Sequence, residues 1–193
     1  MAYQLKISLD GSSKPPIWRR VLIPDKFSFH ELHAVIQATM GWENAHLYAF
    51  RPQDRRGEDI GIPFDDDFMG VETQDARKIL IQSQLTQEKQ KIAYEYDFGD
   101  GWAHTVLVEK ITDDKIVACR CLGGKGACPP EDCGGIYGYY MLVEAVNDPK
   151  NPEHDDMLDW LGMEEGEQWD VNDFELEECQ QEIIHYQQYT EGW

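Results

Sequence analysis

The stretch YEYDFGDGWAH, residues 94–104, places an aspartate and a histidine on either side of a turn signal. Asp100-Gly101 favours a two-residue hairpin turn, because both central positions of a type I′ turn need positive φ. That turn puts Asp97 directly opposite His104, and cross-strand Cβ atoms are about 5 Å apart. We therefore predict a hydrogen bond between this carboxylate and the imidazole, which favours the protonated ring or fixes one tautomer of the neutral ring.

A longer loop would remove this contact. If residues 98–101 form a four-residue loop, Asp97 faces Trp102 instead of the histidine. An Asp–His pair occurs in many active sites, where the carboxylate orients the imidazole base, and it is also an ordinary structural hydrogen bond. The local sequence leaves both interpretations open.

Two further histidines extend the candidate site. His33 lies beside the apolar stripe of a predicted helix, and His46 opens the strand that follows that helix. With Asp97 and His104 they form a set of nitrogen and oxygen donors of the kind that divalent metals bind. These four residues are the candidate catalytic or metal-binding group, although their spacing along the chain does not require them to meet.

Four of the five cysteines form a second candidate site. Four thiolates can hold a structural zinc ion, but the spacing lacks the paired C-x2-C knuckles of zinc ribbons, so free or partly buried thiols are the alternative. The odd number of cysteines, without a secretory signal at the start of the chain, argues against a disulfide scaffold. Cys179 lies on the apolar face of the last predicted helix and is interpreted as a small core residue. The candidate zinc ligands are Cys119, Cys121, Cys128 and Cys133.

The charge of the chain limits its partners. Of 193 residues, 37 are Asp or Glu and 17 are Lys or Arg, which gives a net charge of −20. Residues 151–193 contain 14 acidic residues and no Lys or Arg, so this segment repels phosphates, and nucleic acid is an unlikely partner. No stretch approaches the roughly 18 to 20 apolar residues that span a bilayer. We expect a cytoplasmic protein with no membrane partner, whose partner is another protein or a small molecule.

Periodicity predicts the fold. Alternating apolar residues indicate strands at 3–9, 17–23 and 46–51, and a 3.6-residue stripe with a Ser28–Glu31 capping box indicates a helix between the last two. This strand–strand–helix–strand opening suggests an α+β fold, with a mostly antiparallel mixed sheet and helices packed on one face. Residues 52–78 look irregular. Further strands are predicted at 78–81, 92–97, 102–111 and 115–121, and helices at 83–90, 137–146, 157–161 and 173–189.

The change in character near residue 147 suggests two parts of one structural domain. Residues 1–146 are expected to form the α+β core. Residues 147–193 are expected to form an acidic helical extension that packs on this core.

Five motifs occur in order along the chain: PPIWRR (15–20), FHELHAVIQATMGW (29–42), HLYAF (46–50), YEYDFGDGWAH (94–104) and GACPPEDCGGIYGY (126–139). Together they resemble a known family, the one named for the third open reading frame of an Ri plasmid. Its members are also described as passenger proteins of insertion elements, sometimes with a resolvase label. The resemblance runs over nearly the whole chain and implies an α+β domain, but it implies no particular mechanism.

The resemblance adds binding candidates and also shows two departures. Relatives often read H-L-H-x-F where this chain has Tyr48, so a role that needs the second histidine is not carried over. The cysteines at 119 and 121 do not look obligatory in the family, which weakens the zinc interpretation. Beside the histidines and Asp97, the shared polar positions that we take as binding candidates are Asp100, Trp102, Glu131, Asp132 and Tyr137.

Three functions follow from these observations. The favoured one is a soluble binding or accessory module, associated through its family with mobile elements. The alternatives are a metal-dependent, hydrolase-like enzyme that uses the His/Asp pocket, and a scaffold stabilised by zinc through residues 119–133. DNA recombination is unlikely, because the serines at 12, 13 and 28 have turn or cap roles and no basic helix-turn-helix is apparent.

Overall fold

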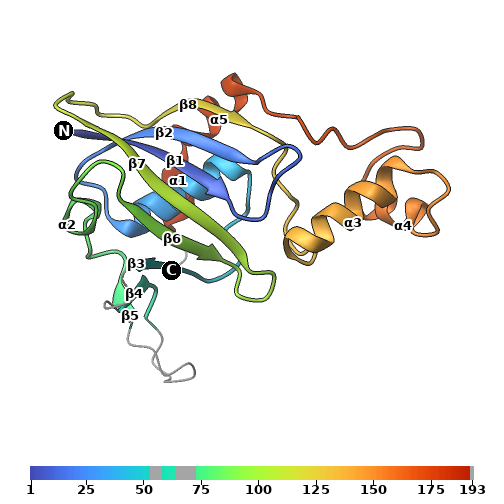
Figure 1. The fold of residues 1–193 in the computed structure, drawn as a ribbon, viewed down its shortest axis with the longest axis horizontal. Coiled ribbons are helices and arrows are strands. Elements are labelled where there is room, and N and C mark those ends of the chain that lie inside the picture. Colours follow the sequence, from blue (N-terminus) through green and yellow to red (C-terminus); the bar gives the residue numbers. More distant parts are fainter. Residues whose placement is uncertain (53–57, 64–72, 192–193) are drawn as a thin grey trace.

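The computed structural model describes residues 1–52, 58–63 and 73–191, and it has the predicted α+β fold (Figure 1). In this part of the chain eight strands form one sheet in the order β5-β4-β3-β6-β7-β1-β2-β8. All neighbours are antiparallel except β4 and β5, which are parallel. The strands are β1 (Ala2–Leu9), β2 (Trp18–Pro24), β3 (Tyr48–Pro52), β4 (Asp59–Gly61), β5 (Thr73–Asp75), β6 (Lys91–Tyr96), β7 (Trp102–Thr112) and β8 (Arg120–Lys125).

The first helix, α1 (Phe29–Met40), confirms the capping prediction. Ser28 accepts a hydrogen bond from the Glu31 amide, and the Glu31 carboxylate accepts one from the Ser28 amide. Gly41 ends the helix in a left-handed conformation with φ of 78°. Such a conformation favours glycine, which has no Cβ to clash.

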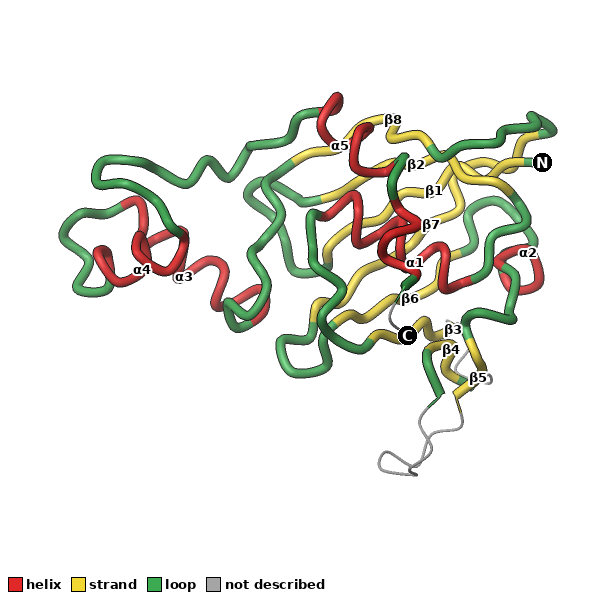
Figure 2. The backbone as a smooth tube through the Cα atoms, turned by 180° about the vertical axis from the view of Figure 1, so that it is seen from behind, coloured by secondary structure: helices red, strands yellow, loops and turns green. Residues whose placement is uncertain are grey.

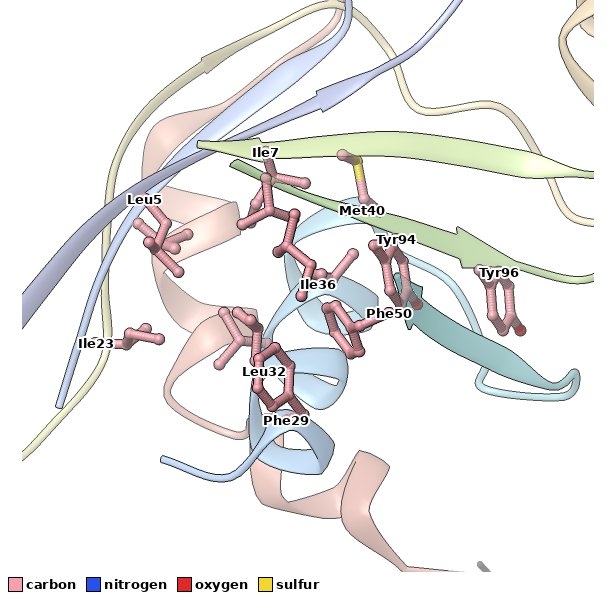
Figure 3. Close-up of a cluster of buried hydrophobic side chains, with 14 of the residues drawn as sticks. Leu5, Ile7, Ile23, Phe29, Leu32, Ile36, Met40, Phe50, Tyr94 and Tyr96 are labelled. Atoms are coloured by element: carbon pink, nitrogen blue, oxygen red, sulfur yellow. The ribbon is translucent and has the colours of Figure 1, made fainter. Parts of the chain in front are cut away.

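The main core lies between α1 and one face of the sheet. Figure 3 shows Leu5 and Ile7 of β1 and Phe50 of β3 directed toward Leu32 and Ile36 of the helix, and all five side chains are fully buried. Burying a side chain of this size stabilises a fold by roughly 1.5–3 kcal/mol. The helix therefore fixes the positions of its own polar residues relative to the central strands.

The other helices fall into two groups. α5 (Leu176–Ile183) and the 3-10 helix η1 (Tyr186–Thr190) return to the α1 side of the sheet, whereas α3 (Gly135–Asn147) and α4 (His154–Leu161) lie beyond one end of it (Figures 1 and 2). α3 and α4 share a small core of Leu142, Val146 and Leu158. This pair includes residues from both sides of the boundary predicted at 146/147, and the division into two parts stays a prediction.

Several predicted elements differ from those observed. The prediction of one long helix over 173–189 is wrong, because regular α-helix in this segment is confined to α5. The strand at 78–81 is a turn with one bridge between Ser28 and Leu80, and the helix at 83–90 is replaced by α2 (Ile81–Gln84). Among the described residues, no helix is both long and apolar enough to cross a membrane.

The last strand is also shifted relative to its prediction. The sequence places a strand at 115–121, but β8 runs through Gly123 and Gly124. A Cβ at Gly124 would lie 2.5 Å from the ring of Phe174, so glycine allows the chain after α4 to pack on this edge strand. The glycines signal a close approach here rather than the end of a strand.

Candidate metal-binding site at the hairpin tip

The β6–β7 hairpin has a different register from the predicted one. Tyr94 faces His104 and Tyr96 faces Trp102, so the prediction that Asp97 pairs with His104 is wrong. Asp97 itself belongs to the turn, which spans residues 97–101. Its φ is 52°, its carbonyl accepts a 2.6 Å hydrogen bond from the Gly101 amide, and its side chain accepts one of 2.9 Å from Gly99.

His104 is a core residue. Its Nδ1 donates to the backbone oxygen of Trp102 at 2.8 Å, and its ring packs edge-on against Trp42, with centroids 5.4 Å apart. Burial lowers the pKa of His104 to about 4. The imidazole is therefore neutral near pH 7, and it does not join the candidate site.

His33 is also held inside the core. Nε2 donates to Oδ1 of Asn44 at 2.7 Å, which leaves Nδ1 to accept from the hydroxyl of Tyr94 at 2.8 Å. The ring stacks on Tyr48 with centroids 3.6 Å apart, and Tyr48 is the residue that replaces the second histidine of the family motif. Burial lowers the pKa of His33 to about 3. Both nitrogens are used, so the arrangement gives His33 a structural role.

The structure brings together His46, Asp97 and Asp132. Oδ1 of Asp97 lies 3.8 Å from Nδ1 of His46, and Oδ1 of Asp132 lies 3.2 Å from Nε2. One donor atom from each residue can be chosen so that all three lie within 4.8 Å of one another. Sequence reasoning had placed the first two residues in one candidate group and Asp132 in another.

The environments of these three side chains differ. The Asp97 side chain is 11% exposed, that of His46 is 29% exposed, and that of Asp132 is 70% exposed. Nε2 of His46 is buried and forms no hydrogen bond with the described residues, because the nearby Asp132 carboxylate is close enough for an ion pair but not aligned for a hydrogen bond. One donor is therefore held within the hairpin, and another is exposed at the surface.

Contacts between the hairpin and the 126–135 loop position Asp132. The hydroxyl of Tyr96 donates to Glu131 at 2.6 Å, and the carboxylate of Asp100 accepts from the Gly134 amide at 3.0 Å. A Cβ at Gly135 would lie 2.3 Å from the backbone oxygen of Asp100. The glycine allows the loop to approach the hairpin this closely.

Of the remaining binding candidates, Trp102 and Glu131 are held by contacts within the fold, whereas Tyr137 is exposed to solvent. Trp102 is buried and packs against Trp42, which in turn donates from Nε1 to the backbone oxygen of Pro129 at 3.0 Å. Glu131 is engaged by Tyr96 and by the Glu43 amide. Tyr137, on α3, is 75% exposed. Sequence reasoning missed Trp42 and Tyr96 as supports of the loop, although both lie in the shared motifs.

The four cysteines predicted as zinc ligands do not form one cluster. Among the described residues, the His46, Asp97 and Asp132 group is the one whose donors lie close enough to hold a metal ion. Cys121 instead lies 3.1 Å from Cys179, sulfur to sulfur. Burial raises the pKa of Cys128 and of Cys133 to about 12, which disfavours the thiolate that zinc requires.

Comparison with known proteins identifies the family. The model of the plasmid pRiA4b ORF-3-like protein family matches residues 1–178. The chain belongs to this family. A relative from Sinorhizobium fredii (strain NBRC 101917 / NGR234), described as uncharacterized protein y4hQ, is 38% identical over 165 residues, which cover 82% of this chain and 80% of the relative.

A solved structure extends the likeness of this ORF-3-like chain to an archaeal protein. The crystal structure of MM3350 from Methanosarcina mazei Go1, described as a protein of unknown function, has a TM-score of 0.75 and 34% sequence identity. The match covers 92% of this chain and 95% of that one. The family therefore combines a shared fold with no assigned activity in these two relatives.

Proposed function

We propose that this ORF-3-like protein is a binding module for a divalent transition-metal ion, held by His46, Asp97 and Asp132. The observation that carries the proposal is the convergence of one imidazole and two carboxylates within 4.8 Å. Imidazole and carboxylate together suit zinc or manganese better than magnesium or calcium, which prefer oxygen ligands alone.

The arrangement of the donors supports a site that closes on its ion. Zinc–ligand bonds of about 2.0–2.2 Å require the three atoms to draw closer together. Asp132 is the exposed member, so rotation of its side chain supplies this movement without disturbing the core. The carboxylate of Asp97 is oriented in advance, because it accepts a 2.9 Å hydrogen bond from the Gly99 amide.

Metal-dependent hydrolysis is the second candidate function. It is favoured by the exposure of Asp132, which leaves one side of the site open to solvent. Catalytic zinc sites use three protein ligands and keep one position for water or substrate. An accessory role in mobile-element biology stays a prediction from the family resemblance.

Metal titration tests the proposal. Chelator-treated protein is titrated with Zn²⁺ and Mn²⁺ by calorimetry, and the metal content is confirmed by mass spectrometry. One ion per chain is expected, with at least tenfold weaker binding in His46→Gln and in Asp132→Asn. The matched controls are His185→Gln and Asp114→Asn, which change exposed residues of the same types and are expected to bind as the wild type does.

Two outcomes would overturn the proposal. One is the absence of stoichiometric binding by the wild type. The other is loss of metal in Cys128→Ser but not in His46→Gln, which would favour the cysteine scaffold. For the hydrolase candidate, the release of p-nitrophenol from phosphate and carboxylate esters is measured with and without metal, and metal-independent rates would remove that candidate alone.

A further inference from the structure

A pocket between α3 and α4 stands apart from the sheet and its core. It has a volume of about 320 Å³ and is lined by apolar side chains that include Met141, Leu142, Met157 and Trp160. Leu142 is 4% exposed and belongs to the small core of this helix pair, whereas Met141 is 47% and Trp160 48% exposed. The pocket therefore has a buried apolar floor and exposed apolar walls.

The exposed apolar walls are unusual for a surface that faces only water. Large exposed apolar side chains that cluster on one surface mark interaction sites, whereas single scattered ones do not. Methionine is unbranched and polarizable, so Met141 and Met157 can adapt to the shape of a partner. Trp160 offers a wide ring that binds apolar groups and also attracts cations.

The rim of the pocket is acidic. Asp132 and Glu153 line it directly, and the exposed face of α4 adds Asp155, Asp156 and Asp159. No Lys or Arg follows Lys150 in the chain. At physiological salt the Debye length is about 8 Å, so this uncompensated charge attracts a cationic partner that comes close to α4 and repels an anionic one.

We infer that the α3–α4 pocket is a docking site for a short basic amphipathic helix of a partner protein. A pocket lined by Met and Trp accepts the apolar face of such a helix, whose anchoring side chains recur at helical spacing. The acidic rim pairs with the Lys and Arg residues on the polar face of the helix. Basic amphipathic helices are recognised in this way when an apolar groove and negative charge lie side by side.

The apolar anchors of this inference are separate from the proposed metal ligands. Asp132 belongs to both regions, but the apolar anchors lie on α3 and α4 and are not candidate ligands. Variants at Trp160 therefore test docking without changing a proposed metal ligand, and variants at His46 test the metal without changing the groove.

Fluorescence anisotropy with a synthetic probe provides the test. The probe is a fluorescein-labelled 14-residue helix of Leu and Lys in amphipathic order, compared with a scrambled peptide of the same composition. The full-length protein is expected to bind the amphipathic probe at least tenfold more tightly than the scrambled one. Trp160→Ala and Met141→Ser are each expected to weaken this binding at least tenfold, and raising the salt is expected to weaken it further.

The control variant is Ile184→Ala, which changes another half-exposed apolar residue, located after α5. It is expected to bind the probe as the wild type does. Equal affinity for the scrambled peptide would overturn the inference, as would unchanged binding in both groove variants. Tetramethylammonium that competes fully with the probe would also overturn it, because the pocket would then be a site for a small organic cation.

Discussion

The hydroxyl of Tyr96 lies 2.6 Å from Glu131 and connects the end of β6 to the loop that carries Asp132. The same hydroxyl accepts a hydrogen bond from the Ala45 amide at 3.0 Å, next to His46. A single buried phenol therefore joins the three chain segments whose side chains form the proposed metal site. This contact makes the site a property of the folded hairpin and loop rather than of a single flexible segment.

Replacing Tyr96 by phenylalanine is expected to lower stability and weaken metal binding together. The change leaves the Ala45 amide without this partner and removes one donor from Glu131. Both hydrogen bonds are part-buried. A hydrogen bond to a charged group contributes about 1.5–3 kcal/mol, and we expect a loss of roughly that size in the free energy of unfolding, measured in urea.

Tyr137→Phe is the matched control, because that hydroxyl is on an exposed side chain. It is expected to change stability by less than roughly 0.5 kcal/mol. Equal stability of the two variants would show that the Tyr96 hydroxyl does not hold the loop.

The buried histidines make stability depend on pH. Burial lowers the pKa of His33 to about 3 and that of His104 to about 4, whereas histidine in an unfolded chain titrates near 6.5. Below about pH 6.5 the unfolded chain binds protons that the folded chain does not bind. The stability contributed by neutral burial is therefore complete above pH 6.5 and is lost as the pH falls toward 4.

Each of these histidines is expected to contribute a slope of about 1.4 kcal/mol per pH unit in this window. Urea unfolding between pH 7.5 and 5 measures the slope while carboxylates of ordinary pKa remain ionised. His104→Asn keeps a donor for the Trp102 carbonyl and removes one titration, so it is expected to lower the slope by about 1.4 kcal/mol per pH unit. His185→Asn, at an exposed position, is the control, and an unchanged slope in His104→Asn would contradict the assignment.

The sequence predicted elements with strong local signals better than it predicted pairings. The Ser28–Glu31 box and Gly41 fix the ends of α1 through bonds within a few residues, and the period-2 strands are present in the structure. The predicted register of the hairpin was wrong because Asp97 adopts a left-handed conformation and belongs to the turn. As a result, His104 lies opposite Tyr94. A two-residue turn signal at Asp100-Gly101 cannot reveal that positive φ falls on Asp97 and Gly101 and not on Asp100.

The candidate site was predictable in part. His46 and Asp97 were grouped from sequence because imidazole and carboxylate are metal donors, and they do lie together. His33 was misplaced because a histidine beside an apolar stripe gives no sign of the Tyr94 and Asn44 partners that bury it. Asp132 joins the site through long-range packing of the loop on the hairpin, and such packing leaves no periodic signal.

The side chain of Arg19 is buried and makes no ion pair among the described residues. It donates to the backbone oxygens of Thr39, Trp18 and Lys125 and lies 4.7 Å from the ring of Phe174. Arg19→Lys is expected to lower the free energy of unfolding by roughly 2–4 kcal/mol, because an ammonium group cannot reach three carbonyls in the fork geometry of a guanidinium.

Limited proteolysis provides a local measurement for the same variant. Loss of the contact with Phe174 is expected to speed cleavage in the segment between α4 and α5. The control is Arg120→Lys, an exposed arginine on the neighbouring strand. If both variants are cleaved at the wild-type rate, the contact of Arg19 with Phe174 does not hold this segment.

Cys121 of β8 and Cys179 of α5 form a pair of thiols 3.1 Å apart. The hydrogen bond from Cys179 lowers the pKa of Cys121, and the same contact raises the pKa of Cys179. Thiolate is the reactive form, so Cys121 is expected to react first with diamide. Cys179 then displaces the adduct, and two electrons and two protons pass to diamide in forming one disulfide.

This cross-link is expected to stabilise the chain, because it closes the long loop between β8 and α5. A loop of this length corresponds to about 4 kcal/mol in the chain-entropy model, and measured effects are often smaller. Peptide mapping without reductant identifies the bond, and thermal unfolding measures its effect. Cys179→Ser is expected to abolish both, whereas Cys128→Ser leaves both unchanged. Recovery of a disulfide between Cys128 and Cys133 instead would contradict the order of reactivity that burial imposes on these thiols.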